Sequence, residues 1–241
     1  MDKNSYLLVV SSQNRESGAP GAFVAKCDRQ RDISHVQLVD VHIPAIFYNV
    51  TSTKNQFDIG GTTYTVSPGA YTASGLVTAL NAATPVLLAG VAFSYNSATN
   101  RFSVVRNPGA PTTYNFGISN SIGTVIGFGT AFDNLTTTPS VAPNEPKLSP
   151  SMIGISIKEI ERGELVRTAF ESDSNICFVF PNNASIGEYI ALEEPYHDQI
   201  APVKHGAIVH FLTVALYDLE NNVALSGYTE NWRFTLRVFH R

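Results

Sequence analysis

The chain has 241 residues, a formal net charge of −4 and a charged fraction of only 15%. This length can bury one good-sized core, or one core with a smaller lobe attached. The slightly acidic balance excludes the strongly basic surface on which binding to a phosphate backbone depends, so we expect no direct nucleic-acid binding.

The amino-terminal part begins with three short runs that are typical of β-strands, at residues 6–10, 21–27 and 35–43. The first run has only five consecutive apolar or aromatic residues. It is too short for the core of a signal peptide or for a membrane span, and we expect neither. Pro44 ends the third run, because proline lacks the amide hydrogen that a β-ladder uses.

The third run leaves its buried face ambiguous. Val36 and Leu38 fall on one face of an ideal strand, whereas Val39 and Val41 fall on the other. Both faces therefore carry apolar residues, and the alternation alone does not identify the core side.

Residues 56–145 break the charge pattern of the rest of the chain. They contain five of the 36 charged side chains (16 basic and 20 acidic in all), which are Arg101, Arg106, Asp58, Asp133 and Glu145. We interpret this stretch as a lobe inserted into a discontinuous domain made of residues 1–55 and 146–241.

Within the insertion, Gly60-Gly61 predicts a hairpin turn, and Thr72 predicts the N-cap of a helix that ends near Ala83. Two more strands are expected at residues 91–95 and 101–105. A short segment follows, with Ser119 as its cap and Gly127 or Gly129 as its end. Residues 134–150 are rich in Thr and Pro, and we expect them to be a linker without a packing pattern.

The carboxy-terminal part again predicts strands, at residues 152–160, 176–180, 189–192, 207–218 and 232–240. Ile153, Ile155 and Ile157 form an inward row in the first of these. Asn221-Asn222 and Ser226-Gly227 supply turn residues before the last. The last strand places one apolar row on a single face, formed by Trp232, Phe234, Leu236 and Val238.

Together the two flanks give about eight strands and no helix long enough to cover a parallel sheet. The predicted fold is therefore mainly β, an antiparallel jelly-roll β-sandwich with an inserted small α+β lobe.

Motifs for catalysis or cofactor binding are absent from the sequence: it has no G-x-S-x-G, C-x-x-C, H-E-x-x-H or P-loop. The densest polar cluster contains Glu193, Glu194, His197, Asp198, His205 and His210. Imidazole and carboxylate together suit a metal or acid–base site. Neighbours such as Glu193 and Glu194 would point to opposite faces of a strand, however, so a solvated loop is the favoured interpretation. We assign no catalytic, cofactor-binding or metal-binding residue.

Cys27 and Cys177 both lie in strand-like runs, which favours two buried free thiols and leaves a disulfide open. Asn49, Asn134 and Asn183 match the glycosylation sequon. Without a signal peptide, we interpret these three matches as chance.

The order of these segments resembles penton and minor capsid proteins of icosahedral double-stranded DNA viruses of the double jelly-roll lineage, including virophages, Polinton-like viruses and adintoviruses. The resemblance rests on VQLVDVHIPAIFYNV in the first flank, on the Y-x-V-x-x-G-x-Y-T-x-x-x-L-x-x-x-L-N pattern from Tyr64 to Asn81, and on the closing segment from Leu212 to Val238. It implies a single jelly-roll that assembles as a homopentamer at the five-fold vertex of the virion. The pentamer would contact the double jelly-roll major capsid protein and other minor capsid proteins, with the lobe facing outward and available to a host receptor.

Two other hypotheses stay open at this point. The chain is alternatively a host-attachment or tail/baseplate protein whose lobe binds a receptor. A third hypothesis, resting only on the cluster from Glu193 to His210, is a hydrolase that acts on glycans. The capsid hypothesis predicts a structural, non-enzymatic protein without cofactors, located in the virion.

Overall fold

The computed structural model describes residues 5–84, 91–106, 109, 113–134, 138–160, 176–193, 199–203, 208–220 and 223–241. The chain divides into two compact units. The first, here called the sandwich, consists of Met1–Ile46 and Pro150–Arg241, and the second, here called the lobe, is Phe47–Ser149. The lobe is wider than the low-charge stretch 56–145, because residues such as Val50 already belong to its core.

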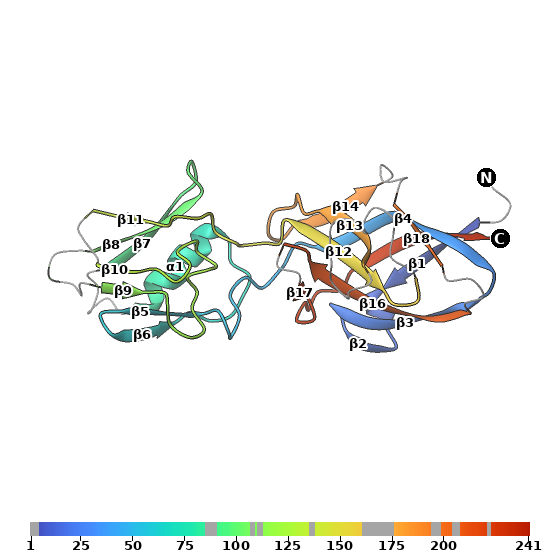
Figure 1. Cartoon of the computed structure of the whole chain (residues 1–241), viewed down its shortest axis with the longest axis horizontal. Helices are drawn as coiled ribbons and strands as arrows, with labels where there is room; N and C mark the ends of the chain where they lie inside the picture. Colours follow the sequence, from blue (N-terminus) through green and yellow to red (C-terminus); the bar gives the residue numbers. More distant parts are fainter. Residues whose placement is uncertain are drawn as a thin grey trace. The chain divides into compact units, whose positions relative to one another are not determined.

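The sandwich contains two antiparallel sheets (Figure 1). The first sheet has the order β1 (Ser5–Ser11), β18 (Arg233–His240), β4 (Ile33–Pro44) and β14 (Tyr189–Glu193), and β15 (Ile200–Pro202) also pairs with β4. The second sheet has the order β13 (Ile176–Pro181), β12 (Met152–Ile157), β16 (Val209–Asp218), β3 (Ala22–Gln30) and β2 (Ser17–Ala19), and β17 (Val223–Ala224) also pairs with β16. A single 3-10 turn, η1 (Ser12–Asn14), follows β1.

The strand order identifies the topology. In chain order the eight main strands are β1, β3, β4, β12, β13, β14, β16 and β18. The first sheet then has the order first, eighth, third, sixth, and the second has the order fifth, fourth, seventh, second. This is a jelly-roll, so the predicted fold class is confirmed. The lobe replaces the connection between the third and fourth of these strands.

A bulge in β4 resolves the ambiguous face of residues 35–43. Thr235 of β18 pairs with Asp40, but the next residue, Leu236, pairs with Leu38, so that Val39 is the extra residue. An extra residue reverses the inside–outside alternation from that point on. The strand therefore buries apolar side chains on both sides of the bulge: Val36, Leu38, Val41 and Ile43.

The sandwich core is built from the inward rows of both sheets. Ile153, Ile155 and Ile157 are buried as predicted. The predicted row of the last strand is buried as well: Trp232, Phe234, Leu236 and Val238. Trp232 packs edge-on against Phe23 at 5.7 Å between ring centroids, which joins the first sheet to the second.

The described residues of the lobe form one helix and two small sheets around an apolar core. One sheet has the order β10 (Phe132–Asn134), β9 (Thr113–Asn115), β5 (Gln56–Ile59) and β6 (Thr62–Thr65), and the other has β11 (Ser140–Val141), β8 (Arg101–Arg106) and β7 (Val91–Asn96). The predicted turn lies between β5 and β6, where Gly60 and Gly61 adopt φ angles of 60° and 84°. Helix α1 (Ala73–Ala83) begins as predicted, since the Thr72 hydroxyl accepts a hydrogen bond from the Gly75 amide at 3.1 Å.

Two predictions for the lobe are wrong. Residues 123–127 form consecutive turns that end, as predicted, at Gly127 with its left-handed backbone, but the hydroxyl that accepts a hydrogen bond from the Gly123 amide belongs to Ser121 and not to Ser119. Residues 134–150 are not a linker without packing: Ala142 is buried, and its amide donates to the Phe102 carbonyl at 2.8 Å. Backbone hydrogen bonds hold this segment, and hydropathy does not reveal them.

Candidate functional site

The polar cluster predicted from the sequence is not assembled into a site by the described residues. Glu193 ends β14 opposite Asp40, and His210 lies exposed on β16 in the other sheet. Glu194, His197, Asp198 and His205 lie outside the described residues, as do Asn221 and Asn222. In the part of the chain that the structure describes, no three His, Cys, Asp or Glu side chains are grouped as metal ligands would be.

Both cysteines are free and buried. The Cys177 thiol donates to the Ile157 carbonyl at 3.6 Å, and burial raises the pKa of this thiol to about 12. Burial and, to a lesser degree, the nearby charge of Asp28 also raise the pKa of Cys27. The thiolate is the reactive form of cysteine, so neither residue is prepared for nucleophilic chemistry.

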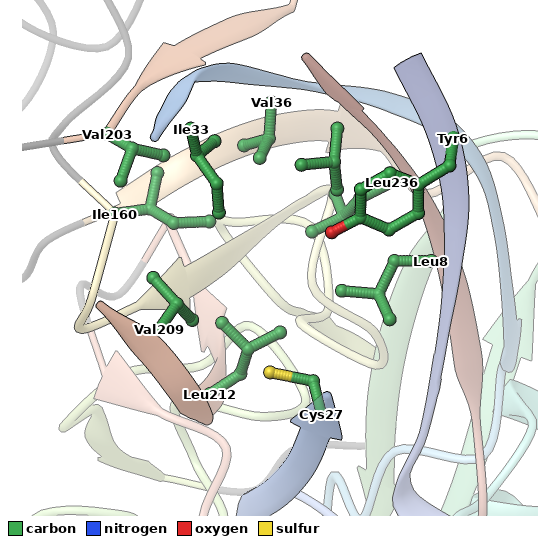
Figure 2. A pocket seen from close by; sticks show the side chains of 11 residues that line it. Tyr6, Leu8, Cys27, Ile33, Val36, Ile160, Val203, Val209, Leu212 and Leu236 are labelled. Carbon is green, nitrogen blue, oxygen red and sulfur yellow. The ribbon is translucent and has the colours of Figure 1, made fainter. Parts of the chain in front are cut away.

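A small apolar cavity lies between the two sheets (Figure 2). Its volume is about 10 Å³, which is close to the room that one water molecule needs. Its walls come from both sheets and include Leu8, Val36 and Leu212, and the hydroxyl of Tyr6 lies against it. This cavity is too small for an organic ligand.

The loop between β13 and β14 holds both places where the lobe joins the sandwich. Where the chain leaves β4, the Ala45 amide donates to the Glu188 carbonyl at 2.8 Å. Where the chain returns, the Asn182 side chain donates to the Pro150 carbonyl at 2.9 Å, and the Asn182 backbone amide donates to the Ser151 carbonyl at 2.8 Å. The two ends of the insertion are therefore fixed by the sandwich itself.

Two asparagines perform a similar task inside the lobe, and sequence reasoning missed their role. The Asn49 amide group donates to the carbonyls of Tyr71 and Leu148 at 2.7 and 2.9 Å, which ties the entering chain to the returning one. Asn81 pairs with both backbone groups of Phe93, at 2.8 and 3.0 Å, and so fastens α1 to β7. The only sequence signal was the place of Asn81 at the end of the Tyr64 to Asn81 pattern.

The outer face of the first sheet carries several exposed apolar side chains. They are Leu7 and Val9 on β1, Tyr189 on β14 and Ile200 on β15, with exposed fractions of 57%, 62%, 64% and 44%. In the register of β1 and β18, Arg237 lies opposite Leu7, and Arg233 lies opposite Ser11, two residues after Val9. A surface of this kind is suited to contact with another protein and not to chemistry.

Comparison with known proteins identifies the fold along the whole chain. A crystal structure of the mavirus penton protein matches with a TM-score of 0.51, covering 99% of this chain and 100% of that one at 11% sequence identity. The resemblance predicted from the sequence is thereby confirmed at the level of the fold. No family model and no curated protein sequence matches. Among the described residues, no helix has the length and hydropathy required to cross a membrane.

Proposed function

We propose that this chain, whose fold is that of the mavirus penton protein from end to end, is the penton protein of an icosahedral virus. Five copies form a ring that closes the five-fold vertex of the capsid and contacts the major capsid protein around it. The lobe faces outward, and the protein has a structural role in the virion without catalytic activity or a cofactor.

The observation that carries this proposal is the coverage of the match. The similarity includes the jelly-roll and extends over practically the full length of both chains, at a TM-score of 0.51. The described residues include no group of three His, Cys, Asp or Glu side chains that could hold a metal ion, which is compatible with a structural role. A jelly-roll also offers rigid side surfaces from which a cyclic assembly can be built.

The proposal is tested by the oligomeric state of the purified full-length chain and by a reconstruction of the source particle. We expect mass photometry to show five copies, and we expect cryo-electron microscopy to show this fold on the five-fold axis. A chain that stays monomeric at all concentrations and does not associate with the major capsid protein contradicts the proposal. Trimers together with binding of the lobe to host cells would instead support a host-attachment protein.

A further inference from the structure

Strand β1 leaves one long edge of the sandwich open. Its sequence, SYLLVVS, contains no charged residue, no proline and no glycine. Strand β18 pairs with one side of β1, and among the described residues no strand pairs with the other side. Leu7 and Val9 project from β1 into solvent. A long, uncharged and apolar edge strand is a surface on which another chain readily pairs.

The two edges of the second sheet are protected, which distinguishes them from β1. Strand β2 has only three residues. The edge of β13 is capped by the side chain of Gln199, which hydrogen-bonds with both the amide and the carbonyl of Val179. Sheets are normally protected from edge-to-edge pairing by such devices.

The open edge also borders a groove. A hollow of about 160 Å³ lies between β1 and β3, lined by β1 residues from Leu8 to Ser11 and by Ala25 and Lys26 of β3. Val9 is among the residues that line it. A partner on this side would therefore cover apolar side chains, unpaired backbone groups and a groove at once.

Charge indicates which partner fits. Beside β1, the outward residues of β18 include Arg233 and Arg237. A two-fold contact of β1 with its own copy would bring these arginines toward their equivalents. Toward the opposite edge, where Tyr189 and Ile200 are exposed, the charged residues are acidic: Glu188 precedes Tyr189, and Asp40 lies on β4 opposite Glu193. The surface beside β1 is thus apolar and basic, and the surface beside β14 and β15 is apolar and acidic. The two surfaces are complementary in charge, as contacts in a head-to-tail ring require.

The register supports this pairing of the two sides. Leu7 lies opposite Arg237, Arg237 lies opposite Gln37, and Gln37 lies opposite Ile200. Leu7 and Ile200 are therefore at the same level on opposite edges of one sheet.

We infer that the β1 side of the sandwich, formed by Leu7, Val9 and the free edge of β1, binds the β14–β15 side of a second copy of this chain, formed by Tyr189 and Ile200. This inference rests on the proposed ring of five copies and assigns the surfaces that close it. The contact is heterologous, so each copy uses both sides.

The first test places charge on the open edge. The double variant Leu7→Lys/Val9→Lys adds two charges beside the existing arginines, and Val223→Lys is the matched control, because Val223 is similarly exposed on β17 (55%). Circular dichroism and thermal unfolding establish that each variant is folded. We expect mass photometry to show pentamers for the wild type and the control, and at least a tenfold lower pentamer fraction for the double variant.

The outcomes separate the inference from the proposed function. A wild-type pentamer that persists in the folded double variant overturns the inference and leaves the penton proposal standing. A wild type that is monomeric at every concentration overturns both. Loss of pentamers in the Val223→Lys control as well would mean that any added charge prevents assembly, and it also counts against β1 as the specific contact.

A second test identifies the partner surface directly. Leu7→Cys and Ile200→Cys are introduced into one chain, and mild oxidation should yield a ladder of covalent species up to five copies on a non-reducing gel. The native cysteines are buried, which keeps the background low. Neither single variant should form the ladder. Efficient dimers from Leu7→Cys alone would indicate a two-fold contact and overturn the head-to-tail arrangement.

Discussion

At the scale of single residues, Tyr6 places an unpaired hydroxyl inside the sandwich. Its hydroxyl is buried, and among the described residues it has no hydrogen-bond partner. The cavity beside it is lined by apolar side chains (Figure 2). A buried polar group without a partner costs roughly 1–3 kcal/mol. Tyr6 therefore contributes packing through its ring while its hydroxyl opposes folding.

Replacing Tyr6 with Phe should remove that penalty and keep the ring. We expect Tyr6→Phe to raise the free energy of unfolding by about 1 kcal/mol, measured by urea denaturation at neutral pH. Tyr217→Phe, on the same sandwich but half-exposed, is the control and should change stability much less. A clear loss of stability in Tyr6→Phe would mean that a water molecule in the cavity satisfies the hydroxyl.

The same variant changes the response to alkali. Burial, and then the charges of Cys27 and Asp28, raise the pKa of Tyr6 from 10.0 to about 12. Below pH 10 the phenol is protonated in the folded and unfolded chain alike, so its titration leaves stability unchanged. Above pH 10 the unfolded chain loses this proton first, and the free energy of unfolding falls as the pH rises. Tyr6→Phe should therefore lose less stability than the wild type between pH 10 and pH 12.

Individual side chains also bear on whether the sequon asparagines can carry a glycan. The Asn49 amide nitrogen already donates two hydrogen bonds within the lobe, and a glycan would replace one of its two hydrogens and so remove one of these bonds. This agrees with the interpretation of that sequon as a chance match. Asn183 is exposed, and the structure sets no comparable obstacle there.

At the scale of elements, helix α1 is held in the lobe by apolar packing and by side-chain hydrogen bonds. Leu76 and Leu80 are fully buried. Asn81 supplies the polar half of the attachment through its two hydrogen bonds with Phe93 of β7. The spacing of apolar residues that a helix needs therefore explains only part of the Tyr64 to Asn81 pattern, and its final asparagine has a separate role.

Removing the Asn81 side chain should loosen this attachment. Asn81→Ala leaves the backbone amide and carbonyl of Phe93 without their partners, and we expect the lobe to lose about 1–3 kcal/mol of stability. The measurement is chemical denaturation of the full chain, followed by hydrogen exchange at the amides of β7. Asn96→Ala, which affects only an exposed turn between β7 and β8, should cost less. Equal effects of the two variants would contradict the special role of Asn81.

Elements with a strong alternating pattern were predictable from the sequence, and those shaped by backbone pairing were not. The row from Ile153 to Ile157 and the row from Trp232 to Val238 show period two clearly, because each strand has one buried face. The bulge at Val39 was visible only as a conflict between two faces, since its position depends on the pairing with β18. Strands β9, β10 and β11 have two or three residues each and carry no pattern long enough to detect.

The candidate surface was less predictable than the fold. Leu7 and Val9 belong to a run that is apolar throughout, so the sequence indicates a strand but not that one of its faces is exposed. That exposure follows from the position of β1 at a sheet edge, which is a property of the topology. The cluster from Glu193 to His210, by contrast, was close in sequence, but Glu193 and His210 lie on different sheets.

At the scale of the whole molecule, the lobe has the properties of an independent folding unit. Its core is complete within Phe47–Ser149 and includes Phe57, Leu76, Phe102 and Ile126, all fully buried. The entering and returning chains are tied together by Asn49. A unit with its own core and adjacent ends can fold without its host domain.

We therefore predict that residues 47–149, expressed alone, form a folded protein. The expected result is a cooperative thermal transition and a well-dispersed amide NMR spectrum. The complementary chain, with a short Gly/Ser linker in place of the lobe, should also fold and should still form pentamers, because the proposed ring contacts lie on the sandwich. An excised lobe without a cooperative transition would mean that its folding depends on the sandwich.

The loop between β13 and β14 has a consequence for how such proteins change over time. Asn182 and Glu188, which belong to the sandwich, hydrogen-bond to the chain at both ends of the insertion. The fold of the sandwich therefore does not depend on the sequence of the lobe. The lobe is thus free to diverge, lengthen or be exchanged by recombination while the β1 edge and its partner side stay matched. In the proposed penton, the outward surface could then change in sequence while the contacts within the shell stay the same.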